Sequence, residues 1–213
     1  MSARRSAPRP PSGTTGPGRP VVWLARHGET EWSRALRHTG RTDVPLTAAG
    51  EAEAAGLGRP LDAVGFDRVL SSPLARARET CALAGLGERA ELRDDLLEWD
   101  YGDYEGQTTA EIRANRPGWL LWRDGCPGGE SAADVGARAD RIIAELLATP
   151  APAPDAGATI AVFAHGHVLR VLAARWIDLP ADAGQRFGLG TATLSRLGWE
   201  HDYRVIQRWN APV

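Results

Sequence analysis

The feature that most constrains the fold is a short apolar run, residues 21–25, followed directly by Arg26-His27-Gly28-Glu29-Thr30. A run of this length is typical of a buried strand, and open α/β sheets bind ligands at the carboxyl ends of their strands. Gly28 allows a sharp turn there. A guanidinium grips phosphate through paired hydrogen bonds, and a neutral imidazole can attack phosphorus. Taken alone, however, Arg26-His27 is more simply a surface pair that follows a strand.

A second predicted strand leads to another arginine. Residues 66–71 run into Ser72-Pro73. Serine is a favoured helix N-cap, and proline suits the first helical position. Arg76 then lies in the first turn of the predicted helix, where the N–H donors and the helix dipole favour an anion. This segment therefore adds a second cation to a candidate phosphate site.

A third predicted strand, residues 159–164, ends at His165-Gly166-His167, and a helix is expected over residues 168–176. We expect the ends of these parallel strands to meet at one edge of the sheet, where ligands bind. The potential phosphate ligands at that edge are Arg26, His27, Arg76 and His165.

Four ordered blocks resemble the histidine phosphatase superfamily, the phosphoglycerate mutase-like proteins, and the resemblance covers residues 21 to about 209. The blocks are Arg26-His27-Gly28-Glu29-Thr30-Glu31-Trp32 with residues 39–47, then Ser71-Ser72-Pro73-Leu74-Ala75-Arg76, then Leu97-Glu98-Trp99-Asp100-Tyr101-Gly102 within residues 96–106, and Ala164-His165-Gly166-His167 within residues 164–170. One block could arise by chance, whereas four in the family's order make coincidence very improbable.

The resemblance implies a role for each matching residue. His27 is the nucleophile that becomes phosphohistidine, and Glu98 protonates the leaving alcohol and later activates water. Arginine and imidazole groups suit this reaction, because phosphoryl transfer depends mainly on positioning and charge stabilisation. The groups expected to bind phosphoryl oxygens are Arg26, Arg76 and His165, and those expected near the rest of the substrate are Ser33, Thr39, Gly40, Gly166 and His167.

The general acid is chosen by the resemblance rather than by spacing. Glu98 lies in an acidic stretch with Asp94, Asp95, Asp100, Asp103 and Glu105. Any of these could serve, and a run of charges is usually a solvated face. We expect those neighbours that face the pocket to raise the proton affinity of Glu98 by like-charge repulsion.

The composition fits one enzyme domain over residues 21–213, preceded by a basic, Pro- and Gly-rich tail over residues 1–20 that is expected to be disordered. The net charge of −2 argues against nucleic acid or an anionic membrane as partner. All 25 basic residues are arginine, which excludes Schiff-base, pyridoxal phosphate and phosphate-loop lysine chemistry. We expect a cytoplasmic enzyme with no cofactor that acts on a small phosphate ester. A homodimer remains open.

Four side chains leave alternatives. His167 could suggest a His-x-His metal site, but no matching cluster is apparent, and the family chemistry is metal-free. His38 either contacts substrate or is an ordinary loop histidine. Cys81 is expected in the core and Cys126 in an exposed loop, which suits a reduced protein without a disulfide.

Strands alternating with helices predict an α/β fold, a three-layer α/β/α sandwich with a mostly parallel central sheet. Helices are expected from Thr47 to about Leu57, after Thr108, and from Ser131 to about Leu147. Residues 191–198 and 203–209 are predicted to form a late hairpin at the sheet edge.

Within the superfamily the choice lies between phosphatase and cofactor-dependent phosphoglycerate mutase. Thr109 stands where mutases carry a lysine, Ser33 and His167 stand where they carry asparagine, and the segment between Arg113 and Gly129 is too short for their insertion. These departures favour hydrolysis. The third block of this sequence is most similar to that of bacterial acid phosphatases and of sedoheptulose-bisphosphatase-type enzymes. A catalytically weak phosphate-binding protein on the same fold is the third alternative.

Overall fold

A computed structural model describes residues 18–153 and 156–213. It contains one six-stranded sheet in the order β3-β2-β4-β1-β5-β6. The strands are β1 Val21–Arg26, β2 Arg68–Ser71, β3 Ala90–Leu92, β4 Thr159–Ala164, β5 Leu194–Glu200 and β6 Tyr203–Ala211. Strand β5 runs antiparallel to both of its neighbours, β1 and β6, and the other pairs are parallel, so the predicted mostly parallel sheet and its late hairpin are confirmed.

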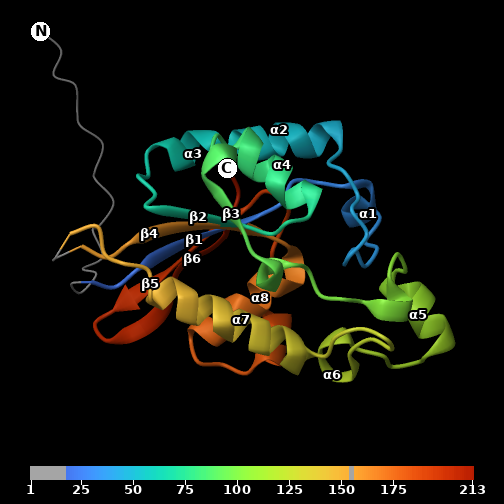
Figure 1. Ribbon diagram of the computed structural model, residues 1–213. Helices are drawn as coiled ribbons and strands as arrows, with labels where there is room; N and C mark the ends of the chain where they lie inside the picture. Colours follow the sequence, from blue (N-terminus) through green and yellow to red (C-terminus); the bar gives the residue numbers. More distant parts are fainter. Residues whose placement is uncertain (1–17, 154–155) are drawn as a thin grey trace, which may run out of the picture.

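Helices cover both faces of the sheet, as predicted for a three-layer sandwich (Figure 1). The helices α2, α3 and α4 lie on one face, and α7 and α8 lie on the other. Their bounds are α1 Glu31–Arg34, α2 Ala48–Gly56, α3 Gly58–Asp62, α4 Ala75–Leu83, α5 Thr109–Asn115, α6 Leu121–Asp124, α7 Ala132–Leu147 and α8 Gly166–Trp176. Two buried apolar clusters result, one on each side of the sheet.

Side-chain caps fix three of the predicted helix starts. Thr47 accepts a hydrogen bond from the Gly50 N–H at the start of α2. Capping boxes begin α5 at Thr108 and α7 at Ser131. Each such cap stabilises a helix by about 1 kcal/mol, because it satisfies N–H groups that the helix leaves free.

The predicted start of α4 is wrong. The helix begins at Ala75 after an extended Leu74, and neither Ser72 nor Pro73 caps it. The Ser72 N–H instead donates to the Phe163 carbonyl, and the Ser72 hydroxyl lies 2.7 Å from Nε2 of His165. Ser72 therefore continues the β2–β4 contact and supports the site rather than the helix.

Two further boundaries and the burial of one cysteine differ from the sequence predictions. The helix α8 starts at Gly166 rather than Val168, and β5 starts at Leu194 rather than Thr191. Cys126 is buried, not exposed, and burial raises the pKa of its thiol to about 12. Cys81 is buried as predicted. Of the predicted tail, residues 1–17 lie outside the described residues, as do residues 154–155 of the connector before β4.

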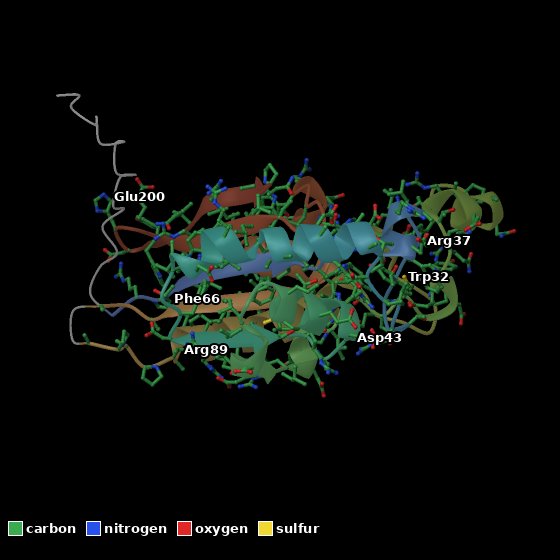
Figure 2. All side chains as sticks on the ribbon, turned by 90° about the horizontal axis from the view of Figure 1, so that it is seen from above. Trp32, Arg37, Asp43, Phe66, Arg89 and Glu200 are labelled. Carbon is green, nitrogen blue, oxygen red and sulfur yellow. The ribbon has the colours of Figure 1, made fainter. Side chains whose placement is uncertain are left out.

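The strand register places the functional segments at one edge. Arg26 at the end of β1 pairs with Ala164 at the end of β4, and Ser71 at the end of β2 pairs with Phe163. The segments that follow, around His27 and His165, therefore leave the sheet side by side. Figure 2 shows Arg37, in the loop after β1, at this end of the molecule, with Glu200 of the hairpin at the other end.

Candidate active site

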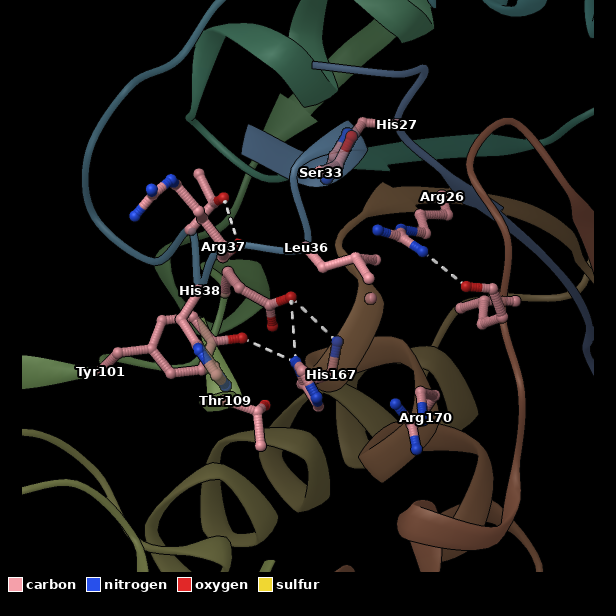
Figure 3. A pocket seen from close by; sticks show the side chains of 14 residues that line it. Arg26, His27, Ser33, Leu36, Arg37, His38, Tyr101, Thr109, His167 and Arg170 are labelled. Atoms are coloured by element: carbon pink, nitrogen blue, oxygen red, sulfur yellow. Dashed lines mark hydrogen bonds and ion pairs between the residues drawn. The ribbon is translucent and has the colours of Figure 1, made fainter. Parts of the chain in front are cut away.

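A cavity of about 340 Å³ opens beside the carboxyl ends of β1 and β4 (Figure 3). A volume of this size fits a small-molecule ligand. The lining residues are Arg26, His27, Ser33, Leu36, Arg37, His38, Thr39, Glu98, Tyr101, Thr109, Gly166, His167, Arg170 and Leu189. The cavity thus collects side chains from segments far apart in the sequence.

His27 enters the cavity from the turn after β1. Nδ1 of its ring lies 2.8 Å from the Gly28 carbonyl, which can only accept, so Nδ1 carries the proton. The lone pair on Nε2 is then free to attack. Gly28 has no room for a side chain, because a Cβ there would lie 2.2 Å from the Gly50 carbonyl oxygen. The close approach of this turn to α2 therefore holds the ring in place.

The ring of His27 is kept neutral. Burial, followed by the positive charges of Arg26 and Arg76, holds its pKa well below the usual 6.5. Burial is the larger of these causes. A neutral imidazole is the form that can act as a nucleophile.

Arg76 and His165 form a buried layer that does not line the open cavity. Nε of Arg76 donates to Nδ1 of His165 at 3.1 Å, so the proton of the His165 ring is on Nε2. The His165 ring centroid lies 5.2 Å from that of His27. The other Arg76 donors bond the carbonyls of Thr42, Thr39 and Gly40, which leaves one Nη1 N–H of the five without a hydrogen bond among the described residues, with Oδ1 of Asp43 4.0 Å from Nη1.

Arg26 faces the cavity with an unused donor. Nη1 donates to the Leu189 carbonyl at 2.5 Å (Figure 3). Nε is buried and has no hydrogen-bond partner within the described part of the chain. Gly166 lies under the guanidinium, and a Cβ there would come within 3.4 Å of its central carbon. A buried N–H without a partner is costly, so this guanidinium is set to receive an oxygen ligand.

Glu98 is fixed at the N-terminus of α8. Oε1 accepts from the backbone N–H groups of Trp99 and Val168, and Oε2 accepts from that of His167, each at 2.9 Å. A carboxylate offers about four acceptor positions, so one remains on Oε2. The carboxylate also lines the cavity, which leaves this position for a substrate proton.

The predicted crowd of carboxylates around Glu98 is absent from the cavity. Asp94, Asp95, Asp100, Asp103 and Glu105 do not line it. Asp95 pairs with Arg141, and Glu105 accepts from the N–H groups of Gly40 and Thr42. The neighbouring carboxylates therefore do not face the pocket, which was the condition for the expected like-charge repulsion.

Four of the five predicted substrate contacts line the cavity: Ser33, Thr39, Gly166 and His167. Gly40 does not, because its N–H is bound by Glu105 and its carbonyl by Arg76. His38 lines the cavity, which favours the first of its two interpretations.

Sequence reasoning missed five of the lining residues, namely Leu36, Arg37, Tyr101, Arg170 and Leu189. Arg170 lies one helical turn beyond Gly166 on α8, a spacing that could have revealed it. Leu189 lies in a segment before β5 that carries no motif, so no sequence signal was available for it.

Two negative findings concern the described residues only. Across residues 18–153 and 156–213, no group of three or more His, Cys, Asp and Glu side chains is arranged to hold a metal ion. Over the same ranges, none of the helices combines the length and the apolar character that a bilayer crossing requires.

The fold and the site together define an α/β enzyme with a neutral imidazole, two arginines and a carboxylate at the carboxyl edge of its sheet. The family model of the histidine phosphatase superfamily (branch 1) matches residues 22–212. The chain therefore belongs to the histidine phosphatase superfamily.

Individual relatives are consistent with that membership. An acid phosphatase of Mycobacterium tuberculosis is 43% identical over 185 residues, which cover 86% of this chain and 88% of the relative. A sedoheptulose 1,7-bisphosphatase of Saccharomyces cerevisiae is 39% identical, covering 75% and 68%. A solved structure of mycobacterial glucosyl-3-phosphoglycerate phosphatase has a TM-score of 0.79 at 31% identity, covering 90% of this chain and 98% of that one. The predictions of the fold and of a phosphoric monoester hydrolase are confirmed.

Proposed function

We propose that this phosphatase hydrolyses small phosphorylated metabolites through a phosphohistidine at His27, without a metal ion. The observation that carries the proposal is the pairing, in one cavity, of a neutral His27 with a free Nε2 and an Arg26 with an unused buried N–H. The imidazole supplies a nucleophile, and the guanidinium supplies a donor for a phosphoryl oxygen.

In the first half-reaction, Nε2 of His27 forms a bond to phosphorus while the bond from phosphorus to the ester oxygen breaks. Glu98 passes a proton from Oε2 to that oxygen, so the alcohol leaves neutral. Arg26 and the remaining N–H of Arg76 balance the negative charge on the phosphoryl oxygens. Nε2–H of His165 is a third donor if it leaves the Ser72 hydroxyl.

In the second half-reaction, water attacks the phosphohistidine. Glu98 takes a proton from the water as its oxygen bonds to phosphorus, and the P–N bond returns its electron pair to Nε2. The products are inorganic phosphate and free His27, and Oε2 of Glu98 holds the proton until it passes to solvent or to the next ester. No step requires a metal, because the arginines supply the positive charge that phosphoryl transfer needs.

The relatives support small phosphorylated metabolites as substrates, since their names specify an acid phosphatase, a sugar bisphosphatase and a phosphoglycerate-derivative phosphatase. We also propose a cytoplasmic location, supported by the free, buried thiols of Cys81 and Cys126. The homodimer stays a prediction that light scattering can test.

Phosphate release from a panel of sugar phosphates, compared between wild type and His27→Ala, tests the proposal. We expect turnover by wild type and none above background by the variant, with matching circular dichroism spectra. A folded His27→Ala variant that retains substantial turnover would show that another group is the nucleophile.

A further inference from the structure

The cavity has a second end, away from His27, where two histidine rings face each other. The rings of His38 and His167 are nearly parallel, with an interplanar angle of 11° and centroids 6.5 Å apart. Both line the cavity, with Thr109 on the same wall (Figure 3). The reaction described above uses neither ring, so their role must concern the rest of the substrate.

The ring of His38 presents an acceptor to the cavity. Nδ1 lies 2.8 Å from the Gln107 carbonyl and must donate to it, which leaves Nε2 of the neutral ring without a proton. The ring is held at its edges by Tyr101 and Trp119. Burial lowers the pKa of His38, so the neutral ring predominates near pH 7.

The ring of His167 presents a donor. Its Nδ1 lies 2.6 Å from the Tyr101 hydroxyl oxygen. Within the described residues, this nitrogen is the hydrogen-bond partner of that hydroxyl. Tyr101 is fully buried and its pKa is raised well above 10 by burial, so it keeps its proton and donates it to Nδ1. The proton of the neutral His167 ring is therefore on Nε2. Burial and the charge of Arg170 lower the pKa of His167 and keep the ring neutral.

The two arginines at this end make hydrogen bonds within the protein. Arg37 donates to the Gly106 carbonyl and pairs with Glu111. Arg170 donates to the carbonyls of Gly184 and Gln185 and lies over the ring of Trp122. The Nη1 and Nη2 groups of Arg37 are thus engaged within the protein, whereas Nη1 of Arg170 has no hydrogen bond among the described residues. Beside that nitrogen, the two neutral rings are the groups at this end that can contact a substrate.

We propose that this end of the cavity recognises neighbouring hydroxyl groups of a polyhydroxylated phosphate ester, with His38 accepting from one hydroxyl and His167 donating to another. Tyr101 acts as a positioning residue that fixes the donor form of His167. A hydroxyl both donates and accepts, so it satisfies either ring. A carboxylate only accepts, so it would leave the lone pair of His38 facing a negative charge. The inference rests on the proposed function and specifies its substrate class.

The test compares two esters with the same six-carbon chain, sorbitol 6-phosphate and n-hexyl phosphate. For wild type we expect kcat/KM to favour the sorbitol ester by about 10- to 100-fold, because two hydrogen bonds distinguish the substrates. No preference, with both esters hydrolysed, would overturn the inference and leave the phosphatase proposal intact. No hydrolysis of either ester would overturn both.

Two variants identify the groups responsible. His38→Phe keeps an aromatic ring beside Tyr101 and Trp119 but removes the acceptor, and the sorbitol-to-hexyl ratio should fall by about tenfold. His38→Gln restores an acceptor and should recover part of that ratio. An equal loss on both esters in His38→Phe, or an unchanged ratio, would contradict the role of His38.

For Tyr101→Phe, the readout is the tautomer itself. In wild type, the ¹⁵N chemical shifts of His167 should show a protonated Nε2 and an unprotonated Nδ1. The variant should lose that single form and part of the sorbitol preference. A wild-type spectrum with the proton on Nδ1, or a variant that keeps both the tautomer and the preference, would refute the positioning role.

Discussion

Replacement of Glu98 by glutamine separates its two roles, as an anchor for backbone N–H groups and as an acid. The carboxylate accepts three backbone N–H groups at the start of α8. The amide oxygen of glutamine can still accept two of them, but its NH₂ group faces the third N–H with no acceptor. Loss of one hydrogen bond to a charged group costs about 1.5–3 kcal/mol, and loss of a negative charge at a helix N-terminus costs about 0.3–1 kcal/mol more.

The stability loss should lower the Tm of Glu98→Gln by about 5–15 °C for a domain of this size. The catalytic loss should depend on the leaving group. An alkyl alcohol needs the proton, so kcat/KM on alkyl phosphates should fall by about 10²- to 10⁴-fold. A nitrophenolate leaves without a proton, so the loss on p-nitrophenyl phosphate should be far smaller.

Glu105→Gln provides a matched control. Glu105 also accepts backbone N–H groups, from Gly40 and Thr42, but it lies outside the cavity lining. This variant should affect alkyl and aryl esters equally. Equal losses on both esters in Glu98→Gln, measured on folded protein at 20 °C or another temperature well below its Tm, would refute the assignment of Glu98 as the acid.

Three other predictions follow from the same site. A chelator should leave turnover unchanged and vanadate should inhibit, because arginines rather than a metal ion supply the positive charge that phosphoryl transfer needs. A loss of turnover in chelator that a divalent ion restores would contradict this prediction. The free energy of unfolding should fall as pH drops below about 6.5, by up to about 1.4 kcal/mol per pH unit for each of His27, His165 and His167. The reason is that the unfolded rings bind protons, whereas the buried rings, with their lowered pKa values, do not. Urea titrations that give the same free energy of unfolding at pH 7 and pH 5.5 would argue against neutral burial of these rings. Phosphate release from sugar phosphates should greatly exceed interconversion of 2- and 3-phosphoglycerate, even with 2,3-bisphosphoglycerate added, since Thr109 lines the cavity at the position where mutases carry a lysine. Efficient interconversion with little phosphate release would favour the mutase.

Five of the six strands and the residues at their ends were predictable, because apolar runs and basic residues at the ends of those runs are local features of the sequence. The short strand β3, whose side chains are half-buried or exposed, has no such run and was not predicted. Arg26, His27 and His165 all lie where those features place them. Ser72 was misread because its N–H group has a partner in β4, which no local pattern reveals.

The far end of the cavity could not be predicted for a similar reason. The donor form of His167 depends on Tyr101, 66 positions away in the chain, and the acceptor form of His38 depends on Gln107, 69 positions away. Burial of Cys126 likewise comes from packing of its loop into the larger core cluster. Such contacts arise from the tertiary fold rather than from spacing in the sequence.

The central claim is that phosphorus becomes bonded to His27, and rapid quenching tests it most directly. Wild type mixed with a ³²P-labelled phosphate ester and quenched in alkali within milliseconds should yield labelled protein. The label should be stable in alkali and lost in acid, as phosphohistidine is, and mass spectrometry should place it on the peptide that contains His27. His27→Ala should take up no label. Turnover by wild type without labelled protein at any quench time, or a label on another residue, would contradict the account.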